Sequence, residues 1–321
     1  MSKLGISIAS TPGNINLAPE LAREAEAAGF VGTFTPEGGT NDGLMTCFTI
    51  ARATSRIGIY TWITNIHFRL PVLCAGSAMM VQEAAAGRFV LGLGVSHRPA
   101  MEALGVRVEN NRDKLRAYAG DLRRIFNGEV PGGRGRPAAK PSYPMPIYFS
   151  ALSLETARLA GEMADGMELL MCSPERARRQ AEVAWEGARA NQRDPQAFKV
   201  TVGTPVYLSD DLDRAYQAAQ ENLAPYLMLP FYQRQWVRSG FEAEAKAAQE
   251  AARRGDSAGQ RAAVSRRLID SVALVGSAAR CAQRLADYQA TGAEIVVLSP
   301  RPVQNDMATA TRAVIKAFGS N

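Results

Sequence analysis

Short apolar runs alternate along the chain with longer stretches in which apolar residues recur at helical spacing. The runs are mostly continuous, which is typical of parallel strands covered on both faces. They predict strands at Leu4–Ala9, Val31–Thr35, Ile57–Thr64, Phe89–Val95, Ile147–Ala151, Met167–Met171, Val200–Leu208 and Glu294–Ser299. The periodic stretches predict helices at Leu17–Ala28, Leu44–Ala53, Val72–Ala86, Arg112–Asn127, Leu154–Met163 and Pro174–Asn191. This alternation favours an α/β fold, a (β/α)₈ TIM barrel.

Two segments interrupt the alternation. Asn127–Tyr143 is rich in glycine and proline and is predicted to be a loop. Pro225–Asp270 is mostly polar and helical in pattern, and it separates the seventh predicted strand from the eighth. We expect it to be an insertion that acts either as a lid over the barrel mouth or as a surface helical hairpin or dimer contact. The length of 321 residues suits one barrel domain over 1–321, although length alone also allows two domains.

Composition narrows the class of protein. The chain is 46% hydrophobic but has no apolar run of about 18 residues, so no membrane span is predicted. Its first residues, MSKLGISIAS, lack the apolar core of a signal peptide, so we expect a cytoplasmic protein. The four cysteines form no CxxC pair and are expected to be buried, reduced thiols. With two histidines in the whole sequence, no metal site is expected.

The net charge of +6 raises the question of nucleic-acid binding. The basic residues are, however, interspersed with acidic ones on helices, as in RARRQAEVAWEGARA, and no basic run is interleaved with aromatics. We therefore expect no nucleic-acid partner. An anionic small molecule suits the excess charge better.

Several common catalytic motifs are absent from the sequence. It contains no GxxxxGK[ST], HExxH or GxSxG. Gly92-Leu93-Gly94 lacks the third glycine of a dinucleotide-binding fingerprint. No lysine stands clearly at a strand end, as a Schiff-base aldolase would require. Hydride chemistry on an organic cofactor fits this shortage of side-chain catalysts, because the cofactor carries the reaction.

Candidate site chemistry lies where two predicted strands end. RFVLGLGVSHR (88–98) and PIYFSALSLETARLAGEMADGMELLMCSP (146–174) each begin with an apolar run that ends in small and hydroxyl residues. In a parallel barrel, residues at the carboxyl ends of strands form the active site. These two units suggest a barrel that holds a phosphate-bearing cofactor.

Four segments resemble one known family: AREAEAAGFVGTFTPE (22–37), the block from Ser55 to His97, PIYFSALSLETARLAGEMADG (146–166) and VALVGSAARCAQRLADYQATGAEIVVL (272–298). The chain is similar over nearly its whole length to the bacterial luciferase-like oxidoreductases, a superfamily of flavin- and deazaflavin-dependent barrels. The phrase GRFVLGLGVSH is most similar to members that use coenzyme F420, a deazaflavin.

The resemblance implies a cofactor ring in the barrel mouth, backed by a cis peptide bond that here falls at Trp62–Ile63. A small residue is more common in the family at the position of Trp62. Residues expected to bind the cofactor are Thr61, Trp62, Ile63, Asn65, Ser96, Arg98, Ser150, Ala151, Ser153, Leu154 and Thr156. Of these, the hydroxyls of Ser153 and Thr156 and the N-terminus of the following helix would hold the phosphate, with Arg98 neutralising it.

Proton transfer is assigned to His97, with Glu37 as the second candidate. His67 would either contact the edge of the ring or serve as a loop histidine. Glu168 lies inside an apolar strand and must be paired or face a polar layer, and it receives no role. A mouth lined by Trp62, Ile66 and Phe68 would favour a hydrophobic or ring-containing substrate.

The resemblance predicts an oxidoreductase that transfers a hydride between coenzyme F420, or a flavin, and a small organic substrate. One alternative is an FMN-dependent monooxygenase that uses O2 and reduced flavin. Another is a non-catalytic flavin-binding subunit. The family also implies a homodimer formed through the early helices.

Overall fold

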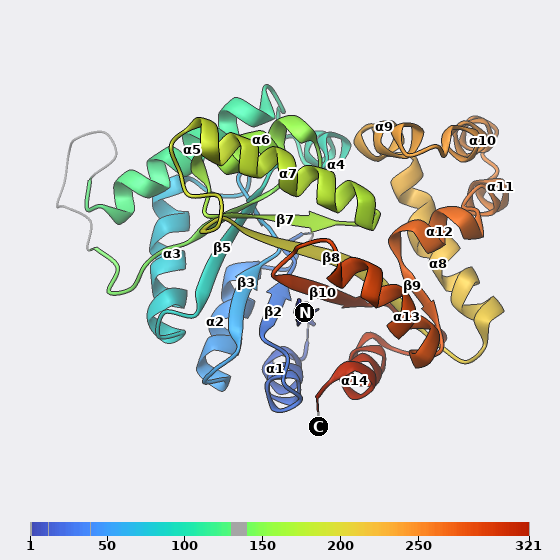
Figure 1. The fold of residues 1–321 in the computed structure, drawn as a ribbon, viewed down its shortest axis with the longest axis horizontal. Coiled ribbons are helices and arrows are strands. Elements are labelled where there is room, and N and C mark those ends of the chain that lie inside the picture. The colour runs from blue at the N-terminus through green and yellow to red at the C-terminus, as the bar shows by residue number, and fades with distance from the viewer. Residues whose placement is uncertain (1, 12, 39, 130–139, 321) are drawn as a thin grey trace.

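The computed structural model describes residues 2–11, 13–38, 40–129 and 140–320. Eight parallel strands close into a barrel surrounded by helices, which confirms the predicted TIM barrel (Figure 1). The barrel strands follow one another in chain order, and the last pairs with both the first and the seventh. They are β1 (Lys3–Ser7), β2 (Gly32–Thr35), β3 (Gly58–Thr61), β5 (Phe89–Gly94), β6 (Ile147–Ser150), β7 (Gly166–Leu170), β8 (Lys199–Leu208) and β10 (Ile295–Pro300).

Two short strands lie outside this count. β4 (Thr64–Asn65) follows β3 and pairs with β5, so it continues the third barrel strand beyond a break at residues 62 and 63. β9 (Leu274–Gly276) pairs with the carboxyl half of β8, away from the closed barrel. β9 was not predicted from the sequence, and it is only three residues long.

The helices that follow the barrel strands agree well with the predicted ones. They are α1 (Leu17–Ala27), α2 (Gly43–Ala53), α3 (Pro71–Ala84), α5 (Asn111–Phe126), α6 (Leu154–Met163) and α7 (Pro174–Ala190). Four further helices lie outside the ranges predicted for helices: α4 (Arg98–Ala103), α8 (Leu212–Leu227), α13 (Ala278–Gln289) and α14 (Met307–Phe318). The predicted loop at Asn127–Tyr143 lies largely outside the described residues.

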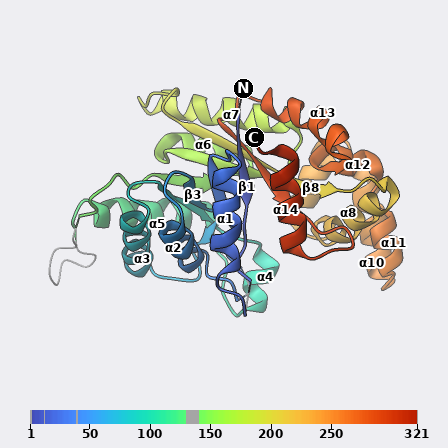
Figure 2. The same cartoon turned by 90° about the horizontal axis from the view of Figure 1, so that it is seen from below.

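The insertion between β8 and β10 is helical, as predicted. It comprises α9 (Pro230–Arg238), α10 (Glu242–Arg253), α11 (Ser257–Ala262) and α12 (Arg266–Val272). Together with α8, these helices enclose an apolar cluster of their own, which includes Tyr232 and Trp236. Figures 1 and 2 both place the insertion at the opposite end of the molecule from α2 and α3. In the described part of the chain, none of the helices combines the length and apolar character needed to cross a membrane.

Large aromatic side chains fill the barrel interior against glycines on other strands. Phe34 and Tyr60 stack with ring centroids 4.3 Å apart, and Trp62 meets Phe34 edge-on. A Cβ at Gly5 would lie 2.6 Å from the Phe34 ring, so only glycine fits there. A small number of large aromatic side chains thus fill the barrel interior below its mouth.

Candidate active site

The third barrel strand is broken where the family resemblance predicted. The peptide bond between Trp62 and Ile63 is cis, as expected. Ile63 packs on the neighbouring strand β5, where a Cβ at Gly94 would lie 2.5 Å from the Ile63 side chain. Thr61, just before the break, is fully buried. Its hydroxyl donates to the Gly92 carbonyl at 3.0 Å and accepts from the Gly92 N–H at 2.9 Å, so it joins β3 to β5.

Glu37 holds the strand segment beyond the break. Its carboxylate accepts hydrogen bonds from the Asn65 N–H at 3.0 Å and the Gly43 N–H at 3.3 Å. It also pairs with Arg69 at 3.1 Å, and the Glu37 side chain is only 2% exposed. Burial raises the pKa of the Glu37 carboxyl, while the donors around it oppose that shift. The carboxylate thereby fixes the position of Asn65.

Asn65 and His67 are held by contacts within the same loop. The Asn65 side-chain oxygen accepts from the His67 N–H at 3.0 Å. The His67 ring lies between Lys114 Nζ, 2.8 Å from Nδ1, and Asn111 Oδ1, 3.3 Å from Nε2. Because Lys114 can only donate, it fixes the proton of a neutral ring on Nε2. Burial, and then the charge of Lys114, lower the pKa of His67. These contacts match the loop-histidine interpretation.

His97 faces the insertion at the end of β5. Ser96, just before it, has a left-handed backbone (φ +55°), a conformation that is uncommon outside glycine and often found at functional sites. The His97 ring lies 5.5 Å from the Tyr232 ring and 6.5 Å from the Tyr226 ring, measured between centroids. Burial lowers the pKa of His97, so its neutral form is favoured. The insertion therefore reaches the barrel mouth at His97.

The loop after β6 has the features of an anion-binding site. Ser153 caps α6: its hydroxyl accepts from the Thr156 N–H at 3.1 Å and lies 3.1 Å from the Thr156 hydroxyl. Leu154 is the first residue of this helix, and Ser150 is the last residue of β6. The side chain of Ala151 is fully buried beneath the loop. The free N–H groups of the first helical turn and its dipole favour a negative ligand here.

A basic residue that binds this loop was not predicted from the sequence. Arg176 on α7 donates to the Leu152 carbonyl at 2.9 Å. Its buried Nε has no hydrogen-bond partner among the residues that the structure describes. Arg98, which was expected here, instead pairs with Glu102 of its own helix at 3.8 Å and is largely exposed. The signal that could have identified Arg176 is its position in the first turn after the Ser173 cap, at the next strand end.

A cavity of about 270 Å³ opens beside the break, between β1, β10, α1 and α14. Trp62 and Tyr226 line it, as do Ser7, Ser299 and Arg301. Of the residues expected to line the mouth, Trp62 does so. Ile66 instead is buried in the hydrophobic core and Phe68 is exposed at the surface, so neither lines this cavity.

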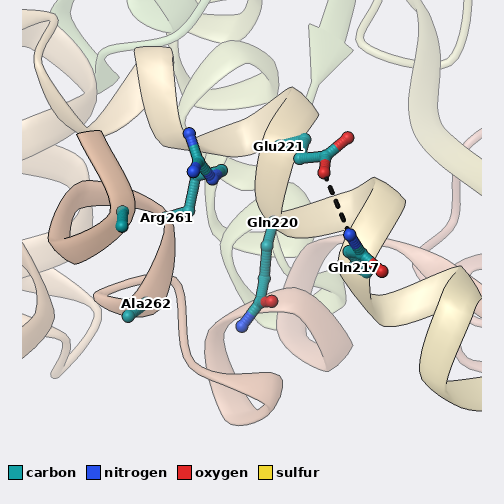
Figure 3. Close-up of a pocket in the computed structure, with 6 residues that line it drawn as sticks. Gln217, Gln220, Glu221, Arg261 and Ala262 are labelled. Atoms are coloured by element: carbon teal, nitrogen blue, oxygen red, sulfur yellow. Dashed lines mark hydrogen bonds between the residues drawn. The ribbon is translucent and has the colours of Figure 1, made fainter.

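A second cavity, of about 370 Å³, lies between α8 and α11 (Figure 3). Its lining includes Gln220, Glu221 and Arg261 but no residue of a barrel strand. Since active sites of TIM barrels form at the strand ends, the cavity beside Trp62 is the better candidate.

Comparisons with known proteins agree with the barrel fold. A family model described as luciferase-like monooxygenase matches residues 3–294. A Mycobacterium tuberculosis protein named as a coenzyme F420-dependent oxidoreductase is 25% identical, with 87% of this chain and 89% of that protein covered. The structure of coenzyme F420-dependent tetrahydromethanopterin reductase from Methanopyrus kandleri superposes with a TM-score of 0.82 at 19% identity, covering 99% and 98% of the two chains. The FMN complex of the oxygenating constituent of 3,6-diketocamphane monooxygenase from Pseudomonas putida superposes with a TM-score of 0.69 at 17% identity. The superposition covers 99% of this chain and 97% of that one.

Proposed function

The chain belongs to the luciferase-like monooxygenase family, and we propose that it is an oxidoreductase that transfers a hydride between coenzyme F420 and a small organic substrate. The names of the M. tuberculosis relative and of the M. kandleri structure both support the deazaflavin over FMN. When bound, the deazaflavin ring supplies the carbon that accepts or releases the hydride.

The observation that carries this proposal is a pair of features at the carboxyl ends of the third and fifth barrel strands, which lie on either side of β5. The loop at residues 150–156 offers the Ser153 and Thr156 hydroxyls and the start of α6. Arg176 on α7 binds the loop and adds an unpartnered, buried nitrogen. These groups fit the phosphate of a cofactor. The break between β3 and β4 places Asn65 beside Gly94 at the end of β5, where a cofactor ring would lie. The unpartnered donors at the loop suit an anionic group, and the buried break in the third barrel strand suits an apolar ring. Together they fit a cofactor that carries both.

His97 is the residue proposed to handle the proton. Its neutral ring can accept the hydroxyl proton of a substrate that is being oxidised, and the resulting imidazolium returns a proton in the reverse direction. Tyr226 and Tyr232 exclude water from one side of the ring. Glu37 is proposed as a positioning residue, since its carboxylate already binds Arg69 and the Asn65 N–H.

Parallel titrations of the purified apo-protein with coenzyme F420 and FMN, followed by fluorescence, test the proposal. Tight binding of F420, with hydride transfer to or from a substrate, is the expected result. Tight binding of FMN alone, with oxygen consumption when reduced flavin is supplied, would replace it with the monooxygenase. Bound cofactor that no donor or acceptor turns over would favour a non-catalytic subunit. Binding of neither would overturn the assignment of the loop.

A homodimer is the second part of the proposal. Apolar side chains are exposed together on α2 and α3 and just before α3: Met45, Leu70, Val72, Leu73 and Met80. An exposed apolar patch of this kind favours a protein–protein contact. The patch lies at the other end of the molecule from the insertion (Figure 2), so dimerisation there would leave the helices near His97 free.

A further inference from the structure

Among the described residues that line the cavity beside Trp62, one is charged, Arg301. The other lining side chains are apolar or carry hydroxyls, among them Ser7, Thr11 and Ser299, and the described lining residues include no carboxylate. A cavity that is otherwise neutral and carries one cation is suited to a ligand with one anionic group.

The position of Arg301 is fixed by the barrel. It directly follows β10, and its backbone N–H donates to the Val206 carbonyl on β8 at 2.9 Å. Its Nε is buried and has no hydrogen-bond partner within residues 2–11, 13–38, 40–129 and 140–320. A buried N–H without a partner is costly, because this donor has lost its hydrogen bond to water and gained none from the protein. An oxyanion in the cavity would supply the missing acceptor.

The described groups around Arg301 offer further hydrogen-bond donors to a ligand, and no acidic side chain among them lines the cavity. The first turn of α14 borders the cavity through Met307 and Ala308, so a helix N-terminus faces the same space. Asp306 caps this helix, and its carboxylate is bonded to the Thr309 N–H at 2.8 Å and the Thr309 hydroxyl at 2.9 Å. Asp306 is not among the cavity-lining residues. The local field at Arg301 therefore favours an anion.

We propose that Arg301 binds an oxyanion group of the substrate, so that the enzyme acts on a small organic acid. This inference rests on the proposed oxidoreductase function and adds the substrate class. In the strand order, β1 lies four strands from β6 around the eight-stranded barrel, so the cavity is on the far side from the loop at 150–156. The anion held by Arg301 is thus a different one from the cofactor phosphate.

Tyr226 links the wall of this cavity to the proposed proton-transfer residue. Tyr226 lines the cavity, and the same ring faces His97. Trp62 forms another part of the wall next to the cis peptide. A substrate anchored at Arg301 by its acid group would therefore extend its reacting carbon toward Trp62 and His97. The volume of about 270 Å³ limits such a substrate to small molecules.

Benzoate and its neutral isostere benzamide test the site by calorimetry on the F420-loaded protein. The wild type is expected to bind benzoate in preference to benzamide. Arg301→Met is expected to weaken benzoate binding about ten- to a hundredfold, the loss of a charge-assisted hydrogen bond, and to leave benzamide unchanged. Arg107→Met is the matched control, since it removes the same charge from a side chain that is 88% exposed. This control should bind benzoate as the wild type does.

Three results would contradict the proposal. They are no benzoate binding to the wild type, equal binding by Arg301→Met, and equal losses in both arginine variants. Titration with F420 separates the cofactor from the substrate: Arg301→Met should keep the wild-type F420 affinity, and a weakened affinity would assign Arg301 to the cofactor tail instead. If the wild type binds no F420, the oxidoreductase proposal fails, and the benzoate measurement repeated on the apo-protein still tests Arg301.

Discussion

The indole of Trp62 lies against the α-carbon of Gly203, on the far side of the barrel. A Cβ at Gly203 would overlap the six-membered ring of the indole. The two residues come from the third and seventh barrel strands, which are opposite one another in the strand order. Trp62 therefore crosses the barrel and closes it directly below the candidate cavity.

The first prediction follows from this contact. Gly203→Ala is expected to displace the indole and to destabilise the fold by about 1–3 kcal/mol, the usual cost of overpacking. Gly120→Ala is the control, because Gly120 lies within α5 and a Cβ there meets open space. It should stabilise the protein by about 0.5–1 kcal/mol through helix propensity. Chemical denaturation of both variants measures the difference, and equal stabilities would contradict the packing argument.

The second prediction concerns Glu168, which is 1% exposed inside the barrel. Neither carboxyl oxygen has a hydrogen-bond partner in the described part of the chain, and burial raises its pKa well above the usual value near 4.5. The folded state thus keeps a proton that the unfolded state loses. The contribution of Glu168 to stability is complete below about pH 4.5 and declines as pH rises toward the folded-state pKa.

Glu168→Gln removes this titration. Relative to the wild type, the variant should gain up to about 1.4 kcal/mol of unfolding free energy per pH unit above pH 4.5. Denaturation at a series of pH values measures the gain. Glu182→Gln, on the exposed surface of α7, controls for the loss of a carboxylate and should give a curve parallel to that of the wild type. A parallel curve for Glu168→Gln would mean that this carboxyl is ionised in the fold.

The fold was predictable because its signals are local. Continuous apolar runs identified all eight barrel strands, and Ser173-Pro174 marked the start of α7. The candidate site was less predictable, since its parts meet only through tertiary structure. Arg176 and Arg301 look like ordinary surface arginines in the sequence, and only their buried, unpartnered Nε atoms distinguish them. Tyr226 and Tyr232 belong to helices whose contact with His97 depends on how the insertion folds back.

The third prediction compares two helix caps with the same local geometry. Ser153 caps α6 and Ser277 caps α13, each by accepting an N–H three residues later. Alanine at either position should cost about 0.5–2 kcal/mol of stability. Only Ser153→Ala should also weaken F420 binding, by about tenfold, since its hydroxyl would also contact the phosphate. Equal F420 affinities in the two variants would remove Ser153 from the cofactor site.

The fourth prediction tests the proposed dimer. Leu73→Glu places a charge in the centre of the apolar patch on α3, where the side chain is 63% exposed. The variant should be folded but monomeric in analytical ultracentrifugation, because burying an unpaired carboxylate in an interface is unfavourable. Val237→Glu makes the same change on α9 and should remain dimeric. A wild-type protein that sediments as a monomer, or a dimeric Leu73→Glu, would contradict the proposal.

The fifth prediction uses the fact that the chain has only two histidines. Histidine labelled with ¹³C gives two imidazole signals, and His97→Gln assigns them by removing one. Both should titrate below pH 6.5: burial lowers the pKa of His97, and burial together with Lys114 lowers that of His67. A signal of His97 that titrates above pH 6.5 would place a carboxylate beside the ring and contradict its neutral state.

The same pKa gives the pH dependence of the reaction a definite direction. If neutral His97 accepts the substrate proton, kcat for substrate oxidation should be constant above the His97 pKa and fall about tenfold per pH unit below it. His97→Gln should lower kcat by about 10²- to 10⁴-fold and abolish this acid limb. His67→Gln should retain the limb, since Lys114 and Asn111 already hold that ring. An acid limb that survives in His97→Gln would assign proton transfer to another group.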